Sequence, residues 1–582
     1  MHSMRRFSVL LLPVWLSLGA AWVIPFLVAP HTYPVPTFYS EFAAAVCWTV
    51  LAAVTLGLTW GQPTGLPRIA LAPLALAVAL IVQLAIAPPL NPFFSFGAIV
   101  ALLAAAIICG LGARCRELPG AVTVVAVAVI VGGLLTVAIE LLQLFRVPDL
   151  PATFFSITPL GAGRRMWGNL NQPNHVGTYL AFGLAACLYL AHQYRCWLVP
   201  LWIAMLALLL GMALTFSRGT WIHLAVVGGL AGVVLTAEMR QRSWATKLFA
   251  LVGPLLGLVL AYQIWNCVIA LANGVWALDL PGSMGERLHQ GVGLRSLLWN
   301  HAWHMFRAHP WLGGGWGDYA WNQFVQTDTL GHVEMSMNAH NIVLDLLAKI
   351  GVVGLLAVLA PLTWWAFDLR KRLCRPEVAF LSAIVAVLMV HSLLEYPLHY
   401  IFFLFPFAFT LGYLDSKMLR APSATGAWML SGTVALCGAV LAVRLWMDYA
   451  IVERVYLTQG GAAKALNEHQ DGGAMLLRPY ATLAVAMNAP VNREMAPIAM
   501  ELERTAAQFY PAPATVQRFA LALAFEGKNE AAVTQVRRLY NHYWTDFPAQ
   551  TFTLRQACQR DADALRTFCS RLRSEGLLAS TD

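Results

Sequence analysis

Long apolar runs dominate this sequence, and they constrain its fold more than any other feature. A helix of about 20 apolar residues spans a bilayer, and stretches of that length recur throughout the first 447 residues. Charged residues make up 12% of the chain, against roughly 25% in soluble domains. This composition excludes a soluble multidomain enzyme and a disordered protein. The pattern predicts an all-α, polytopic membrane protein.

The spacing of the apolar runs predicts about thirteen transmembrane helices. The first run follows the basic segment Met1–Arg6 and reaches Ala29, which is too long for a signal-peptide core and therefore reads as an uncleaved span. Twelve more are predicted near 41–60, 68–87, 93–112, 121–145, 174–193, 197–214, 220–237, 248–270, 342–367, 378–395, 398–414 and 425–447. An odd number with a cytoplasmic N-terminus places the C-terminal tail outside.

Basic residues in the short loops support this orientation. The predicted cytoplasmic loops hold fifteen Lys and Arg residues and the opposite loops hold seven, in the direction of the positive-inside rule. The seven are all arginine, the residue suited to bidentate binding of phosphate or carboxylate. They are Arg146, Arg164, Arg165, Arg218, Arg287, Arg295 and Arg307. The alternative is that some pair with Asp149, Asp279, Glu286 or Asp318 in structured loops.

The chain divides into a membrane domain, 1–447, and a tail, 448–582. Two outer loops of the membrane domain are long, 146–173 and 271–341, and long loops are often functional. The tail is neutral, with 14 basic and 14 acidic residues, so the net charge of +9 does not indicate nucleic acid. Its pattern predicts a small helical periplasmic domain, in which 517–525 and 530–540 resemble one tetratricopeptide hairpin. Cys558 and Cys569 could form a disulfide there if the compartment is oxidising.

Four outer-face segments place polar groups at span ends. They are Gly168–His175, with Gln172, Asn174 and His175; Thr215–Gly219, with Arg218; Ser336–Asn341, with His340; and His391–His399, with Glu395 and Tyr396. Polar groups at this depth are costly, so they indicate a site. Each also has a structural alternative, such as a helix cap at Gln172–His175 or an interfacial histidine at His340.

Together with Arg295, these segments supply what binding a diphosphate and activating a hydroxyl require. His340 is predicted in the first turn of a helix, where a neutral imidazole could accept a proton. Asp345 and Lys349 are four residues apart and are predicted to pair with each other. Other motifs are weaker: His301, His304 and His309 read as part of an interfacial aromatic belt, and Gly313–Gly317 as a flexible turn. No metal site and no cofactor are predicted.

These motifs resemble a known family. The segment from Asn338 to Gly351, N-A-H-N-I-V-L-D-L-L-A-K-I-G, and the S-R-G turn resemble the O-antigen ligase and polymerase superfamily. Within it, W-G-N-L-N-Q-P-N-H, H-S-L-L-E-Y-P-L-H and the early loop His31–Glu41 are similar to the PglL-type bacterial protein O-oligosaccharyltransferases.

The resemblance implies transfer of an oligosaccharide en bloc from undecaprenyl diphosphate to Ser or Thr of a periplasmic protein such as a pilin. It implies that His340, Gln172 and Tyr396 are important and that Arg218, and less securely Arg295, contact the diphosphate. The family often has an acidic residue where this chain has Lys349. The implied location is the bacterial inner membrane with a periplasmic active site. Alternatives are an O-antigen ligase acting on lipid A core, a repeat-unit polymerase, or a transporter or flippase of lipid-linked sugar.

Overall fold

The computed structural model describes residues 9–59, 65–239, 241–282, 293–420, 424–457 and 476–578. Almost all regular structure in these residues is helical, which confirms the predicted all-α class. The described strands are β1 (Gly65–Pro67) and β2 (Met418–Arg420), which pair antiparallel with Leu66 opposite Leu419. Short 3-10 turns occur at η1 Val9–Leu11, η2 Arg68–Ala70, η3 Gly168–Leu170, η4 Arg195–Trp197, η5 Arg370–Arg372, η6 Pro397–His399 and η7 Ala549–Thr551.

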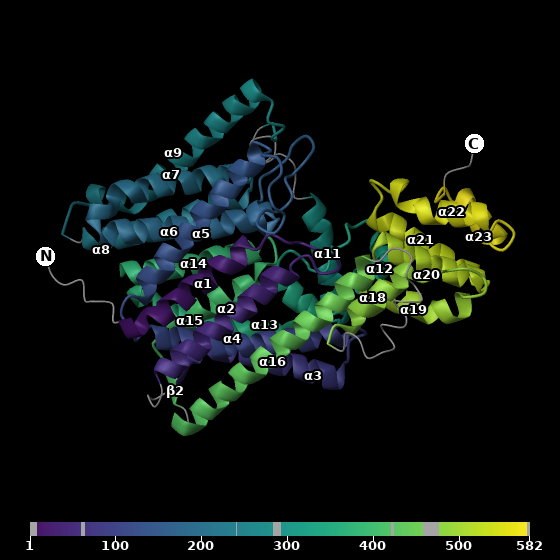
Figure 1. Cartoon of the computed structure of the whole chain (residues 1–582), viewed down its shortest axis with the longest axis horizontal. Helices are drawn as coiled ribbons and strands as arrows, with labels where there is room; N and C mark the ends of the chain where they lie inside the picture. The colour runs from purple at the N-terminus through teal and green to yellow at the C-terminus, as the bar shows by residue number, and fades with distance from the viewer. Residues whose placement is uncertain are drawn as a thin grey trace. The chain divides into compact units, whose positions relative to one another are not determined.

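The chain forms two compact units (Figure 1). Unit 1 comprises 1–74, 101–291 and 358–442, and unit 2 comprises 75–100, 292–357 and 443–582. Four long helices have residues in both units: α3 (Leu71–Ile86), α4 (Pro92–Cys115), α13 (Ile342–Leu369) and α16 (Ala424–Leu457). The last segment of unit 2 begins at Val443, while the predicted domain boundary at residue 447 stays a prediction.

Unit 1 contains most of the apolar helices. Those wholly within it are α1 (Leu12–Leu27), α2 (Phe38–Leu58), α5 (Ala121–Leu144), α6 (Pro173–Gln193), α7 (Leu198–Leu214), α8 (Gly219–Glu238), α9 (Trp244–Trp276), α14 (Pro376–Ser392) and α15 (Ile401–Leu414). Each of the thirteen predicted spans coincides with a helix. Within the described residues, eight helical segments are long and apolar enough to cross a membrane, and α1, α14 and α15 are shorter apolar helices. The polytopic architecture is confirmed, while the number thirteen stays a prediction.

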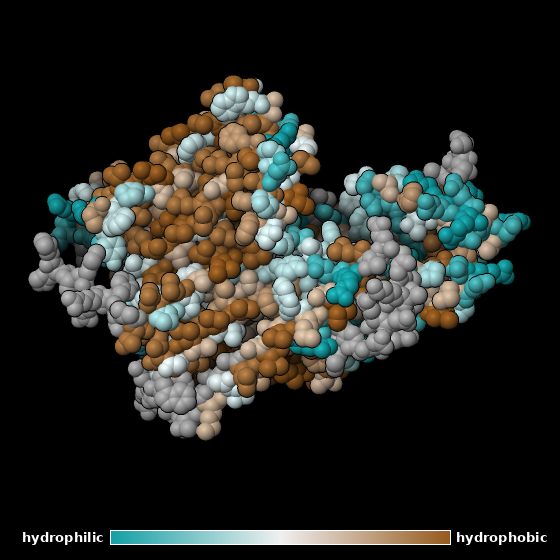
Figure 2. Space-filling model, viewed as in Figure 1, coloured by the Kyte–Doolittle hydropathy of each residue, from teal (hydrophilic) through white to brown (hydrophobic). Residues whose placement is uncertain are grey.

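Close helix packing in unit 1 depends on glycine. A Cβ at Gly112 of α4 would lie 2.0 Å from the carbonyl oxygen of Phe409, and one at Gly412 of α15 would lie 1.9 Å from that of Cys109. Apolar lipid tails give no hydrophobic drive for helices to associate, so small residues that allow close backbone approach stabilise such contacts. Figure 2 shows apolar side chains, in brown, over the long helices of this unit.

Unit 2 contains the long outer loop's own helices, α11 (Gly293–Ala308) and α12 (Tyr319–Leu330), and the tail. The tail helices are α18 (Arg478–Asn488), α19 (Ala496–Phe509), α20 (Pro513–Phe525), α21 (Asn529–His542), α22 (Phe552–Arg560) and α23 (Arg566–Ser574). The predicted hairpin is present as α20 and α21, which turn at Gly527 with φ 75°. Teal, hydrophilic surface covers these tail helices in Figure 2, as expected outside a bilayer.

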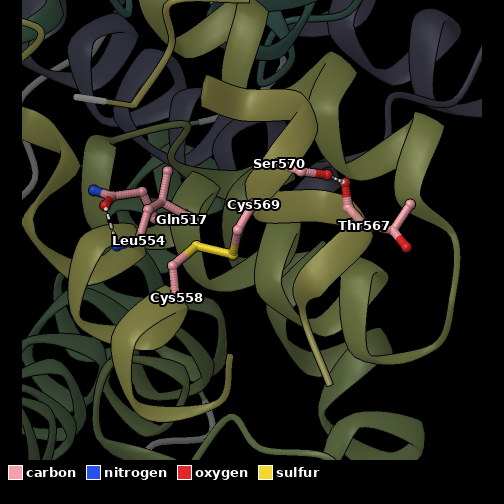
Figure 3. Close-up of a disulfide and its surroundings, with 6 residues drawn as sticks. All are labelled: Gln517, Leu554, Cys558, Thr567, Cys569 and Ser570. Atoms are coloured by element: carbon pink, nitrogen blue, oxygen red, sulfur yellow. Dashed lines mark hydrogen bonds between the residues drawn. A yellow bond between two sulfur atoms is a disulfide. The ribbon is translucent and has the colours of Figure 1, made fainter. Parts of the chain in front are cut away.

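The tail has its own apolar core and a disulfide. Val516, Ala520, Val536 and Phe568 are among its fully buried residues. Cys558 of α22 and Cys569 of α23 form the disulfide shown in Figure 3. The pairing that the sequence left open is therefore present in the structure.

Candidate functional site

A break in α13 shapes the region that contains His340. The helix is interrupted at Gly351, where φ is 68° and ψ is −165°, so Ile342–Ile350 is a separate short helix. The loop after α11 satisfies the interrupted backbone: Gly314 N donates to Ala348 O at 2.8 Å, and Val352 N donates to Pro310 O at 2.9 Å. Irregular backbone in an apolar segment is tolerated where the protein itself supplies such partners.

Glycine at positions 313 and 351 makes this contact close. A Cβ at Gly313 would lie 2.3 Å from Ile350 N, and one at Gly351 would lie 2.4 Å from the carbonyl of Trp311. Gln83 of α3, which is fully buried, adds hydrogen bonds from Nε2 to Leu312 O and to Lys349 O. The sequence predicted a flexible turn at Gly313–Gly317; the structure has a turn there, and its first part makes backbone contacts that the sequence does not reveal.

His340 lies one position before the cap of the short helix. Asn341 caps it, because its Oδ1 accepts hydrogen bonds from Val343 N at 3.0 Å and Leu344 N at 3.2 Å. His340 is half-buried and has φ 51°, in the left-handed region. Histidine is among the residues that tolerate this conformation, and backbone strain of this kind concentrates at functional sites. The prediction placed His340 inside the first turn; the structure places it just before the helix.

Asn174 joins three of the predicted segments in unit 1. Its Oδ1 accepts hydrogen bonds from Ser217 Oγ at 2.8 Å and from Arg165 at 3.2 Å, and its Nδ2 donates to Glu395 Oε1 at 3.2 Å. The S-R-G turn, the E-Y-P-L turn and the start of α6 therefore meet at one side chain. Because protein groups use both ends of its amide, the geometry favours a positioning role for Asn174 over the predicted contact with substrate.

Gln172 and Tyr396 flank this junction. Gln172 caps α6, with Oε1 accepting from His175 N at 2.9 Å, as the structural alternative for this segment proposed. Tyr396 is half-buried, and its ring centroid lies 5.7 Å from that of Tyr400. Tyr400 in turn lies 5.2 Å from the ring of the buried His175.

The early loop is anchored to the same region. His31 contacts the carbonyl of Asn169 through Nε2 at 2.6 Å, and Asn169 Nδ2 donates to Leu27 O at 2.7 Å. Glu41 at the start of α2 accepts from Ile401 N at 2.7 Å. The three segments that are similar to the PglL-type enzymes thus come together in unit 1.

The arginines of the predicted outer loops include two that make structural contacts and two that are at least partly exposed. Arg146 pairs with Asp279, and Arg164 donates to the carbonyls of Leu278, Gln143 and Leu144. These two fit the alternative that such arginines have partners in structured loops. Arg218 is exposed and precedes α8, whereas Arg295 is half-buried on α11 in unit 2. Arg287 lies outside the described residues.

Sequence reasoning named His175 and the segment beginning at His391, but it missed that these two histidines form a buried cluster with His223 in unit 1. The ring of His391 lies 5.5 Å from that of His175 and 6.1 Å from that of His223, and Thr178 Oγ1 lies 2.7 Å from His391 Nδ1. All three histidines are buried. The available signal was weak, because three polar residues in three separate spans show no common spacing. The candidate residues accordingly fall into two sets, with His340 and Arg295 in unit 2 and the others in unit 1.

No group of three or more His, Cys, Asp or Glu residues that could hold a metal ion occurs within the described part of the chain.

Comparison with known proteins shows that the chain is similar to the predicted relatives. Residues 203–359 match the family model described as O-antigen ligase, and residues 166–191 match that of a protein glycosylation ligase. Residues 379–559 match the C-terminal region of a virulence factor membrane-bound polymerase. The first two matches include Arg218, His340, Gln172, Asn174 and His175.

Two curated proteins of Acinetobacter baylyi are similar to this chain. A general O-oligosaccharyltransferase is 25% identical over 476 residues, covering 77% of each chain. A ComP-specific O-oligosaccharyltransferase is 24% identical over 259 residues, covering 44% of this chain and 45% of its own. The resemblance predicted from the motifs is confirmed: the chain has homologues among PglL-type O-oligosaccharyltransferases, and parts of it match the O-antigen ligase and protein glycosylation ligase models.

Proposed function

We propose that this protein transfers an oligosaccharide en bloc from a lipid-linked donor to Ser or Thr of an acceptor protein. The observation that carries the proposal is the match to the general O-oligosaccharyltransferase, which extends over three quarters of both chains. The enzyme class predicted from the sequence, a glycosyltransferase in a multi-pass membrane protein, is confirmed by the homologues and the apolar helices.

In this proposal His340 is the general base. It accepts the proton of the acceptor hydroxyl while the hydroxyl oxygen bonds to the anomeric carbon of the sugar, and the bond from that carbon to the diphosphate breaks. A base of this kind typically contributes about 10²–10⁴-fold in rate. The strained, half-buried position of His340 next to a helix start supports this role.

Arg218 and Arg295 would bind the diphosphate. The leaving group gains negative charge as the bond breaks, and guanidinium groups stabilise such charge when they are held in place beforehand. The exposure of Arg218 at the S-R-G turn supports this role, as does the anchoring of that turn through Ser217 to Asn174. No metal is needed in this scheme.

Gln172 and Tyr396 would orient the donor. Asn174, His175 and Glu395 would position the segments that contain these two residues. The supporting observation is the set of hydrogen bonds and ring contacts that joins these residues within unit 1. A phenol and an amide beside an apolar bundle suit the boundary between the lipid and sugar parts of such a donor.

The carrier, acceptor and location belong to the same proposal. We propose undecaprenyl diphosphate as carrier, a pilin-like periplasmic protein as acceptor, and the bacterial inner membrane with the active site and tail facing the periplasm. The disulfide between Cys558 and Cys569 supports an oxidising compartment for the tail. Labelling of these two thiols in cells before and after reduction tests this placement.

Reconstituted transfer tests the function. Purified protein, lipid-linked glycan and a candidate pilin should give a glycosylated pilin whose mass increases by one whole glycan. The match to the O-antigen ligase model over 203–359 favours lipid A core as the second candidate acceptor. Glycan found only on lipid A core would support the ligase, and longer lipid-linked glycans a polymerase. Movement of donor across vesicles without any transfer would support a flippase.

A further inference from the structure

The short helix before the break in α13 contains a buried ion pair. Lys349 Nζ lies 3.0 Å from Asp345 Oδ2, and their side chains are only 4% and 2% exposed. The two are four residues apart, as the sequence predicted. Burying two charges is costly, so an ion pair in this position is weak evidence for stability and more often serves to fix one arrangement.

Each partner makes a second bond to the residues just before His340. Asp345 Oδ1 accepts from Ala339 N at 2.9 Å, and Lys349 Nζ donates to Asn338 Oδ1 at 2.5 Å. The pair therefore binds one backbone group and one side chain of the two residues that immediately precede His340.

Other bonds fix the ends of this network. The Lys349 ammonium lies 5.4 Å from the ring centroid of Trp316 and 5.5 Å from that of Tyr319, and its backbone oxygen accepts from Gln83 Nε2 at 2.7 Å. On the loop side, Ser336 Oγ donates to Asn338 O at 2.7 Å. Trp316, Tyr319 and Gln83 thus contact Lys349, and Lys349 in turn binds Asn338 in the loop.

We propose that Lys349 and Asp345 are positioning residues that hold His340 in its left-handed conformation toward the reacting hydroxyl. The inference rests on the proposed role of His340 as general base. Misplacement of a catalytic group by about 1 Å can cost roughly 10²-fold in rate, so a loop released from both bonds loses turnover even though His340 is intact. The family often has an acidic residue where this chain has Lys349, so in this proposal Lys349 anchors the loop in a way particular to this chain.

Single and double neutral variants test the inference in the full-length protein. Lys349→Met removes the bond to Asn338 and leaves a buried carboxylate, so we expect kcat to fall about 100-fold with KM for the lipid-linked donor nearly unchanged. The double variant Asp345→Asn with Lys349→Gln keeps an acceptor for Ala339 N and a donor for Asn338 without either charge. We expect the kcat of this double variant to be at least tenfold higher than that of Lys349→Met. Lys528→Met, at an exposed lysine of the tail hairpin, is the matched control and should act like wild type.

The outcomes separate positioning from chemistry and from folding. A wild-type kcat in Lys349→Met would overturn the inference. A double variant that melts at the wild-type temperature yet stays inactive would also overturn it, because one of the two charges would then act directly in the reaction. Modification of His340 by diethyl pyrocarbonate, followed by mass spectrometry, gives a second measurement that does not need transfer. We expect its rate to change severalfold in Lys349→Met and to return in the double variant. If wild-type protein transfers no glycan, the proposed function fails, and the modification rates still decide whether the pair positions His340.

Discussion

At the scale of single residues, the contrast between a base and a hydrogen-bonding cap decides the role of His340. Replacing His340 with Ala, Asn or Gln should each lower transfer by about 10²–10⁴-fold, because an amide replaces a hydrogen bond but cannot take up the proton. Initial rates with a defined donor and acceptor, at matched protein levels, measure this. Substantial transfer by the Asn or Gln variant would end the general-base assignment and leave charge stabilisation as the main catalytic resource.

His542, in the tail, gives a prediction about pH. It is buried against Phe324 at a ring distance of 5.2 Å, and neither ring nitrogen has a partner among the described residues. Burial, with a smaller contribution from nearby His301, lowers the pKa of His542 from 6.5 to about 3. Between about pH 6.5 and 3, His542 is therefore protonated in the unfolded chain but neutral in the folded tail. Stability contributed by this residue is complete above pH 6.5 and falls between pH 6.5 and about 3, by at most about 1.4 kcal/mol per pH unit.

The matched variant for this prediction is His542→Phe, which keeps the ring and removes the titration. Hydrogen exchange of α21 peptides, corrected for the intrinsic rate, should show a smaller loss of protection on acidification in the variant than in wild type. The comparison must be made within this pair, because burial raises the pKa of Glu503 to about 7 and acts in the opposite direction. Equal pH dependence in the two proteins would contradict the assignment.

At the scale of elements, the interruption of α13 predicts a strict need for glycine at 351. Gly351→Ala places a Cβ 2.4 Å from the carbonyl of Trp311 at a φ of 68°, so the break and the docked loop cannot both persist. We expect a loss of about 1–3 kcal/mol in stability and a large drop in transfer. Thermal melting in detergent and transfer rates measure the two effects.

Gly257→Ala is the control for that substitution. It lies within α9 with nothing within 4 Å of the added Cβ, so it should leave melting and transfer unchanged or raise the melting temperature slightly. If Gly351→Ala behaves like this control, the break in α13 has no bearing on the site.

At the scale of the whole molecule, the orientation in the membrane can be tested by fusion. Alkaline phosphatase fused after Asp448 should be active, and fused after Arg372 it should be inactive, because that enzyme folds only in an oxidising compartment. Activity at Arg372 alone would invert the orientation and remove every periplasmic role proposed above. An inactive fusion at Asp448 with the rest as expected would mean an error in the number of spans near 378–414.

The sequence by itself determined the membrane architecture and the tail hairpin. Hydropathy and helical periodicity are local properties, so thirteen apolar runs predicted thirteen helices and the turn at Gly527 marked α20 and α21. The pairing of Asp345 with Lys349 was equally readable, because four residues is one helical turn. The candidate motifs also predicted the resemblance that the homologues confirm, since each motif is a short continuous stretch of the chain.

Only the tertiary structure decided how those residues are used. Asn174 joins segments 43 and 221 residues away, and Gln83 supports the break in α13 from 266 residues away. Such contacts leave no spacing in the sequence, which is why neither the docking of the Gly313–Gly317 segment nor the clustering of His175 and His391 with His223 could be predicted. The two residues before His340 likewise bond to Asp345 and Lys349 in the following helix. The sequence could point to the candidate residues one by one, whereas their mutual contacts depend on the tertiary structure, because only long-range packing brings distant polar groups within hydrogen-bonding distance.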